Sequence, residues 1–146
     1  MSETAREIIY DALRMIFVTG DEERVEPSDA TRGLRTLNRM MAAFESEGID
    51  LGYVAVDALT DDVDIDAGAY EGVIVNLALR LWPYFYKTDP SSMIVANAMK
   101  GKKDLVRISV AATVEAAEFP DTLPLGSGNE GWDGSGSTTF FTLEDE

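Results

Sequence analysis

The pattern of apolar and polar positions predicts a helix in each of four stretches, and the first lies near the N-terminus. Apolar residues recur there at spacings of four and three from Ile9 to Ile16, which is one face of a helix. Thr4 and Glu7 precede them at the spacing of a capping box, in which each side chain satisfies a free backbone N–H group of the first turn. We therefore expect a helix that begins at Thr4 and ends near Gly20.

A second helix is expected over residues 27–48, with Pro27 in its first turn and Ser28 or Asp29 as its N-cap. Its apolar stripe runs at spacings of four and three: Ala30, Leu34, Leu37, Met41 and Phe44. Three arginines lie on the opposite face, roughly 170° away at about 100° per residue: Arg32, Arg35 and Arg39. Two interpretations stay open. The arginines are either solvated, or they contact an acidic neighbour, such as the acidic segment of a second copy, or another protein partner.

Residues 51–66 break the helical pattern, because β-branched and aromatic residues are interrupted there by acidic ones. This pattern favours a short extended arm or a small hairpin. Five aspartates make the arm acidic: Asp57, Asp61, Asp62, Asp64 and Asp66. The last three resemble the start of a calcium-binding loop. Ala67 and Val73 replace the glycine and the glutamate that such a loop requires, so we expect a solvated acidic loop and no metal site.

The third helix is expected over residues 69–82. Almost all of its residues are apolar, which is typical of a buried helix. Pro83 is expected to end or kink it, because proline has no N–H group to donate to the carbonyl of Leu79.

The fourth helix is expected to have Asp89 as its cap and Pro90 at its first position, and to run to about Ala117. Glycine costs stability inside a helix, so Gly101 is expected to permit a close approach to another backbone. The apolar stripe contains Ile94, Ala98, Gly101, Leu105, Ile108 and Ala112. The far face carries Lys100, Lys103 and Arg107. We interpret these basic residues as solvated or as contacts to another subunit or partner, in preference to contacts with DNA.

Together these elements predict a mainly α fold. Residues 1–119 are expected to form a four-helix bundle with the short arm between its second and third helices. Residues 120–146 are expected to form a long extended C-terminal tail, because residues 124–137 hold five glycines and no basic residue and cannot build a core. Trp132 is expected to anchor this tail in a pocket on a partner, since tryptophan is common at the centre of interfaces.

Composition narrows the range of functions. The 146 residues include 12 basic and 27 acidic side chains, with a net charge of −15, and neither cysteine nor histidine occurs. Thiol nucleophiles, thiolate metal sites and histidine acid–base chemistry are thereby excluded. The negative charge argues against nucleic-acid binding. With no long apolar run and no signal-peptide pattern, we expect no cofactor, no membrane contact and synthesis in the cytoplasm.

Several segments resemble the head-to-tail connectors of tailed bacteriophages, most closely the tail accessory factor family of short-tailed phages, also called packaged DNA stabilisation proteins. The segments occur in the family's order: residues 5–17, residues 40–54, and the sequence V-N-L-A-L-R at residues 75–80. The most specific is F-P-D-T-L-P-L-G-S-G-N at residues 119–129.

The resemblance implies a structural virion protein and not an enzyme. It implies a twelve-membered ring at the head–tail junction, beneath the portal ring, that forms after DNA packaging. The ring would retain the genome, receive the next tail component (the nozzle or knob) and pass DNA through its channel without sequence-specific binding. It also implies that the tail binds the portal through Pro124, Leu125, Gly126, Ser127, Gly128 and Asn129.

Two other functions stay open at this point. Paired carboxylates can hydrolyse glycosides without histidine, so a peptidoglycan hydrolase of the virion is one alternative. No spacing singles out a pair among the 27 acidic residues. The other alternative is an acidic protein that binds a basic partner by imitating the charge of DNA.

Overall fold

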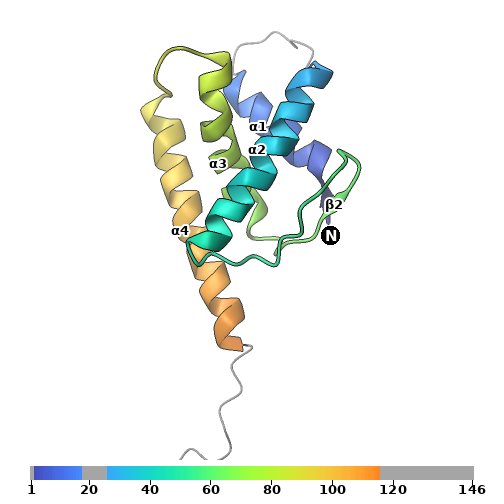
Figure 1. The fold of residues 1–146 in the computed structure, drawn as a ribbon. Helices are drawn as coiled ribbons and strands as arrows, with labels where there is room; N and C mark the ends of the chain where they lie inside the picture. Colours follow the sequence, from blue (N-terminus) through green and yellow to red (C-terminus); the bar gives the residue numbers. More distant parts are fainter. Residues whose placement is uncertain (1, 18–25, 116–146) are drawn as a thin grey trace, which may run out of the picture. The chain divides into compact units, whose positions relative to one another are not determined.

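The computed structural model describes residues 2–17 and 26–115. In chain order its elements are β1 (Glu3–Thr4), α1 (Ala5–Ile16), α2 (Pro27–Ser46), β2 (Asp62–Val63), α3 (Tyr70–Phe85) and α4 (Ser92–Glu115) (Figure 1). The described part is therefore mainly helical, with four helices and one two-stranded sheet, and the predicted mainly α class is confirmed. The predicted tail lies outside the described residues.

Helix α3 is the centre of the core and packs against α1, α2 and α4. Its buried residues lie all round the helix, as its uniformly apolar sequence predicts: Tyr70, Gly72, Val73, Val75, Asn76, Leu77, Ala78 and Leu81. Helices α1 and α2 add fully buried side chains on one face each, among them Ile9, Leu13, Leu37 and Phe44. The apolar stripes predicted for these two helices thus face the core.

The predicted capping box begins α1. Thr4 Oγ1 accepts the N–H of Glu7, and Glu7 Oε2 accepts the N–H of Thr4 at 2.8 Å. The helix ends at Ile16 with Phe17 as its C-cap, and Gly20, which was expected to end it, lies outside the described residues.

The N-cap of α2 lies two positions before Ser28, the earlier of its two predicted caps. Its N-cap is Glu26, without a side-chain cap, and Ser28 and Asp29 lie inside the first turn. The prediction of a Ser28 or Asp29 cap is wrong because Pro27 already has the backbone angle of a first helical residue. The end near Gly48 is confirmed: this residue has a φ of 86° and donates its N–H to the carbonyl of Glu45 at 2.9 Å.

The predicted ends of α3 and α4 need correction. Pro83 lies inside α3, which continues to Phe85, because a proline in the last turn removes only one hydrogen bond from the helix. Helix α4 begins at Ser92, not at Pro90. The side chain that accepts a first-turn N–H is that of Ser91, from Ile94 at 3.4 Å.

Two glycines let α3 and α4 approach closely, as predicted for one of them. A Cβ atom on Gly72 would lie 3.0 Å from the backbone oxygen of Gly101, and a Cβ atom on Gly101 would lie 3.0 Å from the Cα atom of Gly72. Asn76 closes this seam, since its amide donates to the carbonyls of Gly72 at 2.8 Å and Ala98 at 3.1 Å.

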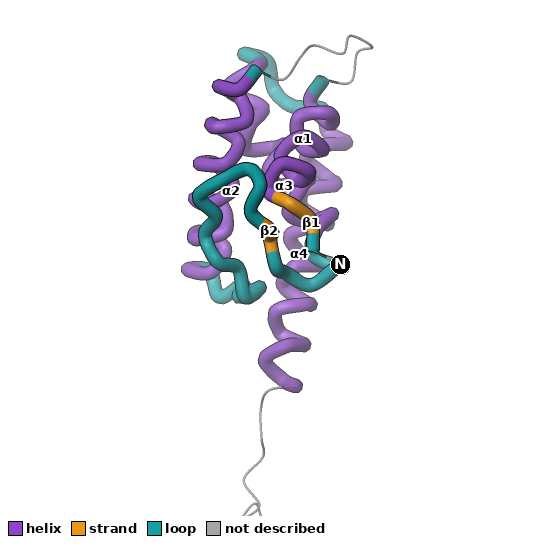
Figure 2. The backbone as a smooth tube through the Cα atoms, turned by 90° about the vertical axis from the view of Figure 1, so that its right-hand side faces the viewer, coloured by secondary structure: helices purple, strands orange, loops and turns teal. Residues whose placement is uncertain are grey.

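The arm between α2 and α3 packs on the body. Strand β2 pairs antiparallel with β1 at the N-terminus, with Glu3 opposite Val63 (Figure 2). The predicted hairpin within the arm is therefore wrong: the arm is extended, but its strand partner is more than fifty residues away in sequence. Val56, Val63 and Ile65 are buried. These buried apolar side chains hold the arm on the core.

Candidate assembly surfaces

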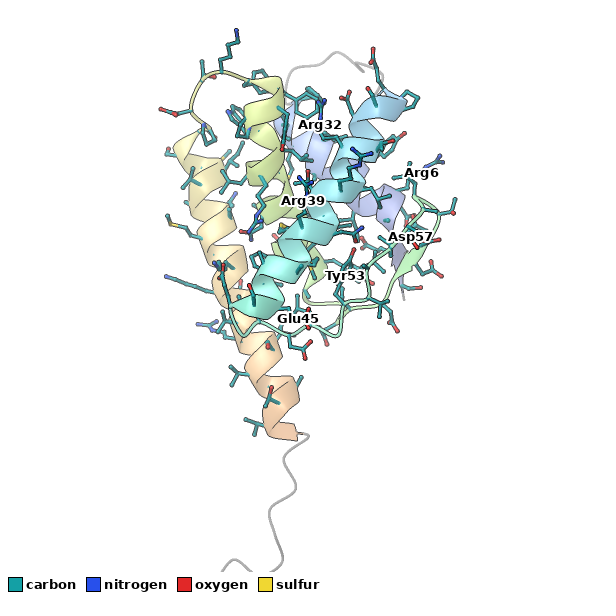
Figure 3. The ribbon with its side chains drawn as sticks, in the orientation of Figure 1. Arg6, Arg32, Arg39, Glu45, Tyr53 and Asp57 are labelled. Atoms are coloured by element: carbon teal, nitrogen blue, oxygen red, sulfur yellow. The ribbon has the colours of Figure 1, made fainter. Side chains whose placement is uncertain are left out.

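The three arginines of α2 share its solvent-exposed face, as predicted (Figure 3 labels Arg32 and Arg39). Arg32 lies 5.2 Å over the ring of Tyr84 and 3.9 Å from an oxygen of Asp29. Within the described residues, no ion pair involves Arg35 or Arg39. These two guanidinium groups therefore present their charge outward.

The acidic arm divides into residues that hold its turns and residues that face solvent. Asp61 accepts the backbone N–H groups of Asp57 and Ala58 at 3.0 and 2.8 Å, and Asp66 accepts that of Gly68 at 2.7 Å. Three carboxylates that make no such turn are exposed: Asp57, Asp62 and Asp64. Across residues 2–17 and 26–115, no ion pair joins the arm to the arginines, and no group of three acidic side chains is arranged to hold a metal ion.

Asn38 is the polar anchor of the arm on α2. Its Nδ2 donates to the carbonyl of Val56 at 2.9 Å, and its Oδ1 accepts the N–H of Val56 and the hydroxyl of Tyr53. Burial raises the pKa of Tyr53 to about 12, so the hydroxyl stays a donor at any physiological pH. No local sequence pattern predicts this anchor, because its hydrogen bonds join residues that are 15–18 positions apart.

The carboxylates beside β1 have opposite shifts. Burial raises the pKa of Glu3, and the negative charges of Asp11 and Glu7 raise it further. Glu3 Oε2 is itself buried and has no hydrogen-bond partner among the described atoms. The backbone N–H of Thr4 and its hydroxyl lower the pKa of Glu7.

The predicted basic residues of α4, Lys100, Lys103 and Arg107, are all exposed. Arg107 lies 3.5 Å from Asp104 on its own helix, and such an exposed pair contributes little stability. The lysine that does bind within the subunit is Lys102, which sequence reasoning missed. It pairs with Glu47 and lies 5.6 Å over the ring of Phe44, joining α4 to the end of α2.

The outer face of α4 carries large apolar side chains in contact with solvent. Val106, Val110 and Val114 are 42%, 55% and 62% exposed and follow at intervals of four residues, so they form one line along the helix. Met99, at 63% exposure, continues that line toward the N-terminal half. We call these four residues the α4 ridge. The four-residue spacing of the valines is visible in the sequence, but a helix with two apolar faces does not show by spacing which face is buried.

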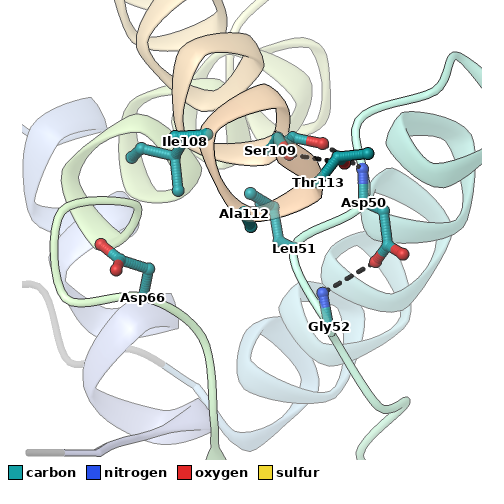
Figure 4. A pocket seen from close by; sticks show the side chains of 9 residues that line it. Asp50, Leu51, Gly52, Asp66, Ile108, Ser109, Ala112 and Thr113 are labelled. Carbon is teal, nitrogen blue, oxygen red and sulfur yellow. Dashed lines mark hydrogen bonds between the residues drawn. The ribbon is translucent and has the colours of Figure 1, made fainter. Parts of the chain in front are cut away.

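A groove lies on the inner side of α4, where the helix leaves the body. Its volume is about 660 Å³, and it is lined by the loop at residues 50–52, by Asp66 and by five residues of α4: Ile108, Ser109, Ala111, Ala112 and Thr113 (Figure 4). Ser109 Oγ accepts the N–H of Asp50 at 2.9 Å and fixes the loop to the helix. Ala112, predicted in the buried stripe, is exposed in this groove, because the last turns of α4 project past the ends of α2 and α3 (Figure 1).

The tail residues singled out from the sequence lie outside the described part: Pro124, Leu125, Gly126, Ser127, Gly128, Asn129 and Trp132. Of the described helices, none is long and apolar enough to cross a membrane. The described part of the chain thus has surfaces suited to protein contacts: an arginine face, an acidic arm, and the ridge and groove of α4.

The comparison with known families agrees with this description. The family model of the P22 tail accessory factor matches the chain from residue 1 to residue 146, which includes the tail and every surface described above. The resemblance inferred from residues 5–129 is confirmed and extends over the full length. The chain therefore belongs to the P22 tail accessory factor family, whose members are structural, virion-associated tail proteins of short-tailed phages.

Proposed function

We propose that this protein is a head-to-tail connector that assembles as a ring beneath the portal after DNA packaging. In this role it retains the packaged genome and provides the platform for the next tail component. The observation that supports the proposal is the family match over the whole chain, a range that includes residues 119–129. The twelve-fold number of copies is part of the proposal and comes from the resemblance.

In this proposal residues 1–119 form the body of the connector, and residues 120–146 form the tail that binds the portal. The body supplies rigid faces for neighbouring copies, since its helices are closed around α3. The tail supplies two large apolar side chains for this contact: Leu125 within the P-L-G-S-G-N motif and Trp132 three residues after it. Burying them on the portal would offset the cost of ordering a glycine-rich chain.

Charge supports the passage of DNA through such a ring. A net charge of −15 repels the phosphate backbone within a Debye length of ~8 Å at physiological ionic strength. DNA bound to the channel wall would resist ejection, whereas a repelling wall lets it slide. The arginine face is proposed to contact an acidic neighbour, with the arm of the next copy as the partner.

The direct test is light scattering of the free protein and of its mixture with the portal ring of the same phage. Wild-type protein is expected to join the portal in a ring-like ratio. The full-length variants Leu125→Asp and Trp132→Ala are expected to lose this binding, while Ser135→Asp, a tail control outside the motif, keeps it. If the wild type never binds the portal, the connector proposal is wrong. If both variants bind normally, the portal contact lies elsewhere.

The arginine contact has its own test. The double variant Arg35→Glu/Arg39→Glu is expected to weaken ring assembly at low salt, with a smaller effect at high salt because exposed charges are screened. Arg14→Glu, a charge reversal on the exposed face of α1, is the matched control. Unchanged assembly of the double variant at every ionic strength would contradict this pairing.

A further inference from the structure

The α4 ridge faces away from the groove-lining residues Ile108 and Ala112. Val110 on the ridge and Ala112 in the groove are two residues apart, which is roughly 200° around an α-helix at about 100° per residue. Both belong to the last two turns of α4, which ends at Glu115; Figure 2 shows this end of α4 extending beyond the other helices. One copy therefore shows an apolar ridge in one direction and an apolar groove in the other.

The two surfaces match in polarity. The ridge consists of three valines and a methionine, and the apolar part of the groove consists of Leu51, Ile108 and alanines of α4. The groove has room for such side chains, since its volume is about 660 Å³. Contact between them removes apolar surface from water on both sides.

The two surfaces also match in charge. Lys103 and Arg107 flank the ridge on the exposed face of α4, whereas Asp50 and Asp66 line the groove. A ridge placed in the groove of a second copy brings opposite charges together. A ridge placed against a second ridge brings Lys103 and Arg107 near their own equivalents, and such like-charge contacts are unfavourable.

We propose that the α4 ridge of one copy docks in the α4 groove of the next copy. This contact is heterologous, because the two partners use different surfaces, and repeated contacts of this kind close into a ring when the rotation permits. The partner at this surface is a second copy of this chain. The inference rests on the proposed ring and identifies the faces that join its subunits.

Cysteine trapping tests this contact with no background, because the chain has no cysteine. Val110→Cys places a thiol on the ridge, and Ala112→Cys places one in the groove. Both positions are exposed, so the variants are expected to fold. Residues two apart on one helix point in different directions and cannot form a disulfide within the chain.

Under mild oxidation, the mixture of the two single variants is expected to give a disulfide-linked dimer that contains one of each. The double variant Val110→Cys/Ala112→Cys is expected to give a ladder of higher oligomers. The control mixture pairs Val110→Cys with Val54→Cys, which lies on the arm outside both surfaces and is 79% exposed. This control is expected to give no mixed dimer.

Each oxidation is performed on the free protein at high concentration and again with the portal ring of the same phage. A Val110→Cys homodimer as the main product would show that the ridge meets a second ridge and would overturn the proposal. A disulfide between Val110→Cys and a cysteine on the portal would identify the portal as the occupant instead. Absence of the ridge-to-groove disulfide in both samples also overturns it.

The connector proposal fails by a different observation. If wild-type protein joins the portal in a ring-like ratio and the ridge-to-groove disulfide is absent, only this contact is wrong. If the disulfide forms but the protein ignores the portal, the contact stands and the portal-bound ring is wrong.

Discussion

Helices α3 and α4 are both rich in apolar residues, but the fold treats them differently. In α3 eight residues are buried, between Tyr70 and Leu81, and they lie on most sides of the helix. In α4 the buried residues are Ala98, Leu105 and Ser109, whereas Met93, Met99 and the three valines of the ridge are exposed. The apolar surface of α3 is buried within the chain. Much of the apolar surface of α4 is exposed, and the contact proposed above would bury it against a second copy.

Truncation of an apolar side chain on each helix tests this difference between α3 and α4 most directly. Leu77→Ala on α3 removes a fully buried side chain and leaves a cavity, so we expect a loss of about 2–5 kcal/mol in the free energy of unfolding. Val110→Ala on α4 is expected to change it by less than about 0.5 kcal/mol, because the side chain is exposed. Urea unfolding of both variants measures the difference.

The same pair of variants is expected to reverse its order in assembly. If the proposed contact is right, Val110→Ala is expected to reduce ring formation on the portal, since it removes part of the ridge. Leu77→Ala leaves the ridge intact and assembles wherever it stays folded. A large loss of stability in Val110→Ala would mean that the outer face of α4 is used within the subunit after all.

The seam between the two helices is the next place to test. Gly72→Ala places a Cβ atom 3.0 Å from the backbone oxygen of Gly101, and backbone cannot move aside cheaply. We expect a loss of about 1–3 kcal/mol from overpacking, which outweighs the gain of about 1 kcal/mol in helix propensity. Lys100→Ala, an exposed neighbour on α4, is the control and is expected to be nearly neutral. Thermal or urea unfolding distinguishes the two.

What the sequence predicts well here is local. The capping box of Thr4 needs only a partner three residues away, and the exposed arginines of α2 need only one helical period. The close approach at Gly101 was predictable, because a glycine lowers the stability of a helix and its place in the apolar stripe indicates close packing. Its partner, Gly72, was not predictable. A pattern along one helix does not say which other helix it meets.

The misses share one physical cause, which is that long-range contacts override local preference. The strand partner of Val63 is Glu3, and no short-range signal connects them. Pro83 is tolerated because its lost hydrogen bond falls in the last turn of a helix that the core already holds. The ridge was visible as valines four residues apart, yet spacing alone does not decide which of two apolar faces is covered within the chain.

A smaller effect is expected from the hydrogen bonds that hold the arm on α2. Asn38→Ala removes the three hydrogen bonds that hold Val56 and Tyr53, and it leaves backbone groups of a partly buried segment unsatisfied. We expect a loss of about 1–3 kcal/mol. Tyr53→Phe removes one of these bonds, so its loss is expected near 1 kcal/mol. Equal stability of Asn38→Ala and wild type in urea would show that the arm is held by its apolar residues alone.

The smallest expected effect concerns the two carboxylates at β1, whose pKa shifts have opposite signs. The pKa of Glu3 is raised in the folded protein, so its contribution to stability is present below the unfolded value of about 4.5 and is lost as the pH rises through the folded value. Glu3→Gln is therefore expected to be more stable than wild type at pH 7, with the difference shrinking toward pH 4. The pKa of Glu7 is lowered, so its contribution is present above about 4.5 and is lost as the pH falls through the folded value.

Glu7→Gln is accordingly expected to be less stable than wild type at pH 7, with the two converging in acid. Urea unfolding at pH 7 and pH 4 measures both variants, and each serves as the control for the other because they change the net charge equally. If both variants move in the same direction at pH 7, net charge governs this end of the protein. If they move in opposite directions, the local environment governs it: burial beside Asp11 for Glu3 and the N-terminal cap of α1 for Glu7. In that case the N-terminal carboxylates are governed by contacts within the chain, in contrast to the exposed apolar side chains at the far end of α4.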